Sequence, residues 1–166
     1  LKRLADAVAD HDRIYALVSG MGAASGTENL GAEISPEAYQ RSFQGAIQEA
    51  GASPDEIGLF ETHGSGQPQE DAVELRALSN LFNASDDMCA LGSTKPIIGH
   101  TGAASGLASI VKAVLCVYHR LLPPLPGYRR PAEAMEAAPF HIPLIPQPWI
   151  KDYNRGPRRA CVAAMT

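Results

Sequence analysis

The spacing of hydrophobic positions changes repeatedly along the chain, and it predicts amphipathic helices that alternate with short buried strands. Ser35-Pro36-Glu37 is typical of a helix start, because Ser caps a helix well and Pro fits its first turn. Gly51 marks the end of that helix. Its apolar stripe consists of Tyr39, Phe43, Ala46, Ile47 and Ala50. The predicted elements are helices over 35–50, 71–82 and 103–119, and strands over 57–61 and 89–92. This order favours a layered α/β domain.

The helix predicted over 103–119 is the most apolar of the three. Its large apolar residues recur at three- and four-residue spacing: Leu107, Ile110, Val111, Val114, Leu115 and Tyr118. Lys112 is the only charged residue before His119, so we expect most of this helix to be buried. Small residues form the opposite face, where they would let another backbone approach closely: Ala103, Ala104, Gly106 and Ala108.

The remaining segments carry weaker patterns. Ile14–Ser19 is an apolar run that suits a buried strand. The glycines of Gly20–Gly26 lack the spacing of a dinucleotide-binding turn, so we expect a loop that runs to about Glu33. Prolines dominate 122–126 and 131–148, which favours an extended segment with Trp149 as its anchor.

The basic run Arg155–Arg159 is most simply a solvated turn before a last strand, and Val162–Thr166 has the composition of that strand. A surface that docks an acidic carrier protein is the alternative interpretation of the basic run.

Two histidines lie in glycine-rich turns directly after predicted strands. His63 follows the strand over 57–61, and His100 follows the strand over 89–92. Ligand sites in open α/β sheets form beyond the carboxyl ends of strands. The positive end of a helix dipole disfavours a protonated imidazole, so we expect His100 to be neutral. One histidine at a helix start is more often structural, but the repeated setting favours a functional site.

Composition excludes several classes of function. The 166 residues leave room for one domain of ordinary size, and 45% of them are hydrophobic. A net charge of -4 and a pI near 5.7 argue against nucleic-acid binding, which usually needs a basic surface. The three cysteines, Cys89, Cys116 and Cys161, lack CxxC spacing, which argues against a metal site and fits a reducing compartment.

No run of eighteen apolar residues or signal core is present, so we expect no membrane contact and a cytoplasmic location. The chain begins without Met and stops inside a predicted strand, and we expect it to be part of a longer polypeptide.

Two long motifs resemble signatures of β-ketoacyl synthases. Glu61-Thr-His-Gly-Ser-Gly-Gln-Pro-Gln-Glu-Asp-Ala-Val-Glu74 resembles their E-A-H-G-T-G-T-x-x-G-D-x-x-E motif. Leu91-Gly-Ser-Thr-Lys-Pro-Ile-Ile-Gly-His-Thr-Gly-Ala-Ala-Ser-Gly106 is similar to their G-S-x-K-x-x-x-G-H-T-x-A-A-x-G motif. Flanking segments also match, so the resemblance covers nearly the whole chain. The stretch 115–126 is most similar to the synthase domains of polyunsaturated fatty acid synthases.

The resemblance implies a thiolase-like fold, in which two similar α/β halves stack into a five-layer αβαβα sandwich. Residues 1–26 would be the tail of the N-terminal half. Residues 27–166 would be the C-terminal half, truncated before its last glycine-rich loop. The implied partners are the missing N-terminal half, an acyl carrier protein, and either a second copy or a chain-length factor in a dimer.

The implied reaction is a decarboxylative Claisen condensation of an acyl thioester with malonyl-acyl carrier protein, in polyketide or polyunsaturated fatty acid synthesis. By resemblance, His63 and His100 would donate hydrogen bonds to the enolate oxygen, and Lys95 would fix the network beside them. Ser65 and Gln67 would face the pantetheine, with Gln67 replacing a Thr of the family. The phosphopantetheine arm of the carrier brings the substrate, and the resemblance implies no directly bound cofactor and no metal.

The chain also departs from the family pattern. The nucleophilic cysteine of the family belongs to a D-x-A-C-S motif that this chain lacks, and we expect all three cysteines to be core residues. The fragment alone should therefore be inactive as an acyltransferase. Pro96-Ile97 replaces a polar pair, and Gly102 stands where many modular synthases carry Glu.

Two alternatives stay open: a chain-length-factor-like partner subunit that does not condense, and a thiolase-superfamily enzyme that uses acyl-CoA directly. The acyl chain length also stays open.

Overall fold

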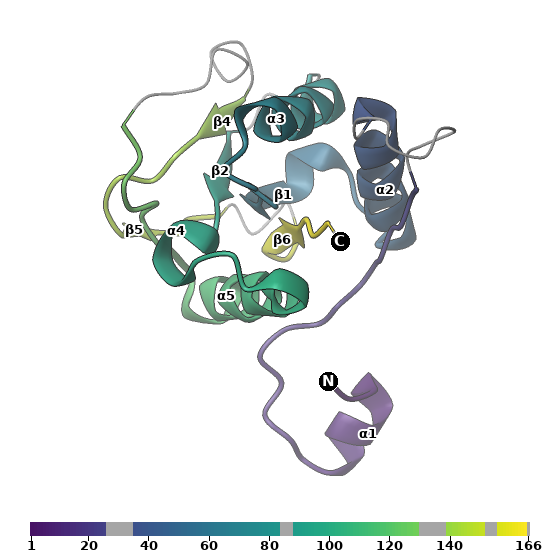
Figure 1. Ribbon diagram of the computed structural model, residues 1–166. Coiled ribbons are helices and arrows are strands. Elements are labelled where there is room, and N and C mark those ends of the chain that lie inside the picture. The colour runs from purple at the N-terminus through teal and green to yellow at the C-terminus, as the bar shows by residue number, and fades with distance from the viewer. Residues whose placement is uncertain (26–34, 84–87, 130–138, 152–155, 166) are drawn as a thin grey trace.

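The computed structural model describes residues 1–25, 35–83, 88–129, 139–151 and 156–165. A parallel sheet with the strand order β4-β2-β1-β6 forms its centre (Figure 1). These strands are β1 (Ile57–Glu61), β2 (Cys89–Gly92), β4 (Phe140–His141) and β6 (Arg159–Val162). A separate antiparallel pair consists of β3 (Leu121–Leu122) and β5 (Gln147–Pro148). The strands predicted over 57–61 and 89–92 are confirmed.

Helices cover both faces of the sheet. α2 (Pro36–Glu49) and α3 (Pro68–Phe82) pack together on one face, and α5 (Ser105–His119) lies on the other (Figure 1). The shorter helical elements are α1 (Leu4–Ala9), α4 (Lys95–Ile98), and the 3-10 turns η1 (Pro54–Glu56) and η2 (Gly102–Ala104). The α/β prediction is confirmed, and the expected boundary between residues 26 and 27 lies outside the described residues.

The start of α2 follows its sequence signals. The Ser35 hydroxyl accepts a hydrogen bond from the Ala38 N–H at 3.1 Å, which satisfies one of the free donors of the first turn. The helix ends before Gly51, whose φ of 57° is a conformation that glycine adopts without strain.

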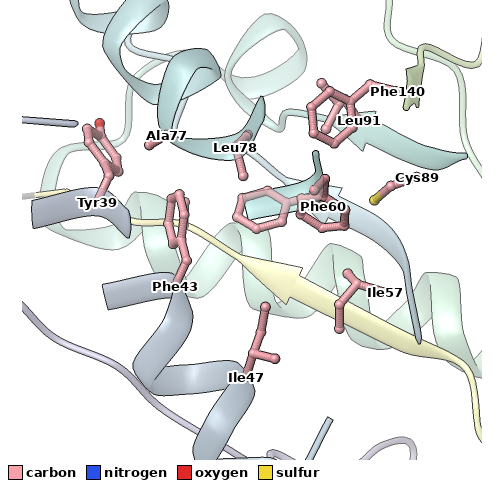
Figure 2. Close-up of a cluster of buried hydrophobic side chains, with 12 residues drawn as sticks. Tyr39, Phe43, Ile47, Ile57, Phe60, Ala77, Leu78, Cys89, Leu91 and Phe140 are labelled. Carbon is pink, nitrogen blue, oxygen red and sulfur yellow. The ribbon is translucent and has the colours of Figure 1, made fainter. Parts of the chain in front are cut away.

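The main hydrophobic core lies between α2, α3 and the sheet (Figure 2). Phe60 on β1 is fully buried at its centre, with ring centroids 5.1 Å from Phe43 and 6.4 Å from Phe82. A smaller cluster lies on the α5 side and comprises Leu59, Ala90, Cys116, Leu122 and Trp149. Consecutive residues of β1 therefore supply both cores, as expected for a strand covered on both faces.

The prediction that most of α5 is buried was wrong, because only its small-residue side faces the sheet. The residues buried against the sheet are small: Ser105, Ser109, Ala113 and Cys116. Leu107, Val111, Leu115 and Tyr118 have exposed fractions of 40 to 60% instead. The close approach of the chain leaves no room for larger groups, since a Cβ on Gly106 would lie 3.0 Å from the Cβ of Ala164. In this stripe Tyr118 contacts Tyr15, with ring centroids 4.8 Å apart, whereas Leu107, Val111 and Leu115 stay 42 to 60% exposed.

By length and hydropathy, Gly102–His119 is the only stretch of the described residues that could cross a membrane. One such helix is weak support for a span, because core helices of soluble proteins pass the same test. The small face of this helix packs on β1 and β6.

The N-terminal segment also differs from the expectation. Ile14–Ser19 forms no strand, because no described strand lies beside it to pair with its backbone. The side chains of Leu17 and Val18 are each 61% exposed. Gly20 and Gly22 then pack directly on α2, where a Cβ on Gly22 would lie 1.9 Å from the Ser42 carbonyl oxygen. Residues 20–25 form a loop as predicted.

Trp149 is the expected anchor of the proline-rich segment, and it is buried against Gly58. That segment contains the two-residue strands β4 and β5, which the prediction of an irregular run missed. Arg158 and Arg159 are half-buried rather than a solvated turn, and Arg159 already begins β6. The last strand is therefore 159–162, not 162–166. Residues 130–138 and 152–155 lie outside the described part.

Candidate active site

The parallel sheet brings the two predicted histidine loops together. β1 and β2 are neighbours whose last residues, Glu61 and Gly92, are paired. His63 follows β1, while Lys95 and His100 follow β2. Because parallel strands end at the same edge, both loops emerge side by side. The rings of His63 and His100 lie with centroids 6.0 Å apart and an interplanar angle of 81°.

His63 is buried, and its hydrogen bonds define its tautomer. The Met165 N–H donates to His63 Nδ1 at 3.1 Å, which requires an unprotonated Nδ1. Lys95 Nζ lies 3.4 Å from the same nitrogen and also donates to the His63 carbonyl oxygen. A neutral His63 therefore carries its proton on Nε2, which is free to donate.

His100 repeats this arrangement at the exposed side of the site. The Gly102 N–H donates to His100 Nδ1 at 3.1 Å, so the proton of a neutral ring lies on Nε2. The chain can turn back on the ring because Gly99 and Gly102 have φ values of 77° and 56°. His100 lies in the glycine-rich turn before α5, as the sequence predicts, and it is exposed in this chain.

Lys95 and burial together keep His63 neutral. Burial lowers the pKa of His63, and repulsion from the charged Lys95, and from His100 whenever that ring is protonated, lowers it further. Burial also lowers the pKa of Lys95, while Glu74 and Asp71 oppose that shift. The arrangement therefore favours an imidazole that donates a hydrogen bond over an imidazolium that carries charge.

Glu74 is a site residue that the sequence interpretation quoted in a motif but gave no role. Its carboxylate is buried and accepts hydrogen bonds from the N–H groups of His63 at 2.7 Å and Gly64 at 2.9 Å. Burial raises the pKa of Glu74, and these two N–H donors oppose the shift. Glu74 thus fixes the backbone that carries His63. Glu74 follows His63 by eleven residues, and α3 starts between them. This spacing was the sequence signal that could have predicted its contact with the His63 loop.

The two residues expected to face pantetheine lie at the start of α3. The Ser65 hydroxyl is 3.2 Å from Asp71 Oδ1, to which it donates, and it accepts the Gln67 N–H at 3.1 Å. Gln67 is exposed at the N-cap of α3. Both residues share the loop of His63, so they border the same site.

The cysteines lie away from this site. Cys89 and Cys116 are buried, and all three are free thiols. Burial raises the pKa of Cys116 to about 11 and that of Cys161 to about 11, and it also raises the pKa of Cys89. Such thiols are poor nucleophiles, and the prediction of core residues is confirmed for Cys89 and Cys116. No group of three or more metal-ligating residues occurs in the described part of the chain.

Two further contributors were missed by sequence reasoning. The backbone N–H of Met165 comes from the segment after β6, more than one hundred residues from His63, and has no sequence signal. Glu61 and Lys112 form a buried ion pair directly beneath the site, with 2.6 Å between Lys112 Nζ and Glu61 Oε1. The sequence shows Lys112 as the only charged residue of an apolar helix before His119. A lone charge in such a helix indicates that an acidic partner lies nearby, although it does not identify Glu61.

The chain is similar in sequence to polyketide synthases and in fold to ketosynthase domains. Residues 15–129 match the family described as "Beta-ketoacyl synthase, C-terminal domain". The chain is 38% identical to "Polyketide synthase PksL" of Bacillus subtilis over 170 residues, covering 99% of this chain and 4% of that protein. It is 38% identical to a mycocerosic acid synthase-like polyketide synthase of Mycolicibacterium smegmatis, covering 99% of this chain and 8% of that protein.

Solved structures agree with these relatives. The ketosynthase from module 6 of the bacillaene synthase of Bacillus subtilis superposes with a TM-score of 0.86 at 37% identity. It aligns with 97% of this chain, which spans 30% of the solved chain. Ketosynthase twelve of the bacillaene polyketide synthase of Bacillus amyloliquefaciens gives a TM-score of 0.85 at 30% identity, with the same coverages. The chain thus has the thiolase-like fold of these domains, and it belongs to the β-ketoacyl synthase family as its C-terminal domain.

Proposed function

We propose that this chain supplies His63, Lys95 and His100 to the active site of a β-ketoacyl synthase that performs decarboxylative Claisen condensation in polyketide synthesis. The observation that carries the proposal is the hydrogen bonding of the two imidazoles. Each Nδ1 accepts a main-chain N–H, from Met165 for His63 and from Gly102 for His100. Each neutral ring therefore presents an Nε2–H donor, and the two ring centroids lie 6.0 Å apart in a nearly perpendicular arrangement.

Paired neutral donors suit the charge that develops in this reaction. When a malonyl thioester loses carbon dioxide, the C–C bond breaks and its electron pair moves onto the thioester carbonyl, which becomes an enolate oxygen. Donors fixed where this charge appears stabilise it without reorganisation. The enolate carbon then attacks the acyl thioester of a cysteine, forms the new C–C bond and releases the thiolate. His63 and His100 would hold the enolate oxygen, and Lys95 would keep His63 neutral and oriented.

The cysteine would come from outside this chain. None of Cys89, Cys116 and Cys161 adjoins the histidines, and this chain spans about a third of the solved ketosynthases. The substrate would arrive on the phosphopantetheine arm of an acyl carrier protein, with Ser65 and Gln67 at its entry. We infer that the fragment alone does not condense, because it lacks the acyl-bearing group.

The alternative of a chain-length-factor-like partner subunit is not favoured. The relatives and solved structures reported above are polyketide synthases and ketosynthases. The neutral, donor-presenting form of both histidines is useful to catalysis and has no purpose in a subunit that only shapes a tunnel. A cysteine in a D-x-A-C-S segment of the complete polypeptide would separate the two functions, since a partner subunit lacks it.

The test is decarboxylation of malonyl-acyl carrier protein by the complete polypeptide. We expect His63→Ala and His100→Ala each to lower the decarboxylation rate roughly 10²-fold or more, as for loss of an oxyanion donor. His119→Ala is the matched control, because this exposed histidine at the end of α5 is outside the site. Rates near wild type in either active-site variant would contradict the proposed roles.

A further inference from the structure

A buried ion pair lies beneath the loops of the site and is used by none of the roles given above. Glu61 is the last residue of β1, is fully buried, and is paired in the sheet with Gly92 on one side and Val162 on the other. Lys112 extends from the small-residue face of α5, and its Nζ lies 2.6 Å from Glu61 Oε1. Glu61 Oε2 has no hydrogen-bond partner among the described residues.

The neighbouring strand leaves space for this pair. A Cβ on Gly92 would lie 2.2 Å from Glu61 Oε1 and 3.0 Å from Lys112 Nζ. Any side chain at Gly92 would therefore displace the carboxylate or the ammonium group. Burying two charges is costly unless they stay together, so the geometry of the pair fixes the distance between α5 and the ends of β1 and β2.

The pair also continues into the loop that carries Lys95. Lys112 Nζ donates to the Ser93 carbonyl oxygen at 3.3 Å, two residues before Lys95. A second link joins the same loop to α5, where the hydroxyls of Thr94 and Ser109 lie 3.0 Å apart. On the other side, the N–H of Thr62 donates to the Gly92 carbonyl oxygen at 2.8 Å. Hydrogen bonds thus connect the segment before His63 to the segment before Lys95, and they connect the latter to Ser109 and Lys112 of α5.

We propose that Glu61 and Lys112 act as a positioning pair, which holds the 92–95 segment so that Lys95 stays against His63. This inference rests on the proposed function, because its consequence is a correctly placed His63 donor. Neither residue touches the substrate in this assignment. Their effect passes through the Ser93 carbonyl to Lys95, whose Nζ reaches both Nδ1 and the carbonyl of His63.

The first measurement is steady-state decarboxylation of malonyl-acyl carrier protein by the complete polypeptide carrying Lys112→Met. Misplacing a group in an active site by about 1 Å can cost roughly 10²-fold, so we expect kcat to fall roughly 10- to 100-fold with KM within about twofold of wild type. Lys112→Arg keeps the charge and should recover most of kcat. Arg76→Met, a cation-to-Met change on the exposed side of α3, is the control and should match wild type.

A pH profile separates positioning from simple stability. Five titratable groups surround His63: Lys95 on α4, His100 in the turn before η2, and Glu70, Asp71 and Glu74 on α3. Lys95 and His100 lower the pKa of His63, and Glu70 and Asp71 raise it. If Lys95 moves away, this pKa rises towards its ordinary value. Because the reaction needs neutral His63, the acid limb of kcat should then shift to higher pH in Lys112→Met and stay in place in Arg76→Met.

The outcomes are distinct. A Lys112→Met protein with lower thermal stability, but with wild-type kcat and an unmoved acid limb well below its melting temperature, would overturn the proposal. If this variant does not fold, Glu61→Gln combined with Lys112→Met removes both buried charges and should show the same loss of kcat and the same shift. A normal rate in that folded double variant would also overturn it.

Failure of the proposed function gives a different result. A wild-type polypeptide that carries the D-x-A-C-S cysteine but does not decarboxylate malonyl-acyl carrier protein would contradict that function. Positioning of Lys95 by the Glu61–Lys112 pair can still be tested in that case, because it is a structural property. A crystal structure of Lys112→Met then decides it. A separation of Lys95 Nζ from His63 Nδ1 that is unchanged from 3.4 Å would exclude positioning, and a displaced Lys95 would support it.

Discussion

At the scale of residues, main-chain N–H groups determine what the two histidines can do. Met165 and Gly102 each donate to an Nδ1, which leaves Nε2–H as the donor on both neutral rings. Glu74 in turn accepts the N–H groups of His63 and Gly64, so it satisfies two backbone donors that the turn after β1 would otherwise leave without partners. In the proposed function the histidine side chains supply the donors, and the backbone determines their orientation.

A substitution at Glu74 tests this support. We expect Glu74→Gln to lower the free energy of unfolding by about 1–3 kcal/mol, because an amide has one acceptor oxygen and leaves a buried N–H without a partner. Equilibrium denaturation of the complete polypeptide measures the change. Glu37→Gln, at an exposed position in the first turn of α2, should cost about 0.5 kcal/mol or less. Equal effects of the two substitutions would contradict the role of Glu74.

At the scale of elements, α5 shows that the packing partner decides which face of a helix is buried. Helical periodicity identified the large apolar stripe correctly, but the sheet takes the small face with Ser109 and Ala113. Close packing on β1 and β6 lets the hydroxyl of Ser109 meet Thr94 and lets Lys112 reach Glu61. A larger residue on this face would push the helix, and the loops tied to it, away from the sheet.

Ser109→Leu tests the assignment of the faces. We expect it to destabilise the chain by about 2–4 kcal/mol, because it overfills a buried position and removes the partner of Thr94. Leu107→Ser, at a position 60% exposed in this chain, should change the unfolding free energy by about 0.5 kcal/mol or less. Denaturation of residues 1–166 expressed alone, at concentrations low enough to keep the chain monomeric, gives both values. The reverse order of effects would contradict this assignment of the faces.

At the scale of the whole molecule, the fragment has an exposed apolar surface without a covering element among the described residues. Leu107, Val111 and Leu115 are 42 to 60% exposed along one side of α5. Contiguous apolar patches on soluble proteins usually mark interaction surfaces. The solved ketosynthases are about three times as long as this chain, which leaves ample sequence to cover the patch.

Residues 1–166 expressed alone should therefore self-associate. We expect light scattering to show dimers or larger species, because association removes the α5 patch from water. Val111→Lys combined with Leu115→Glu should shift the sample towards monomer without loss of helical signal. A stable monomer of the unsubstituted chain at high concentration would contradict the idea that this surface needs a partner.

The sequence by itself determined much of the local structure and the choice of candidate site residues. Ser35-Pro36, the apolar run at 57–60 and the turn glycines indicate α2, β1 and the loops, because helix caps, short apolar runs and positive φ are local properties. The two motifs likewise singled out His63, Lys95 and His100, which the fold brings together and which we propose as the residues that carry the chemistry.

Only the tertiary structure decided how these residues act together. The Met165 N–H on His63, the Glu61–Lys112 pair and the buried small face of α5 all join segments distant in the sequence. Such contacts depend on which strands are neighbours and on how closely a helix approaches them. The spacing of residues along the chain specifies neither the order of the strands in the sheet nor the distance between the sheet and the helix.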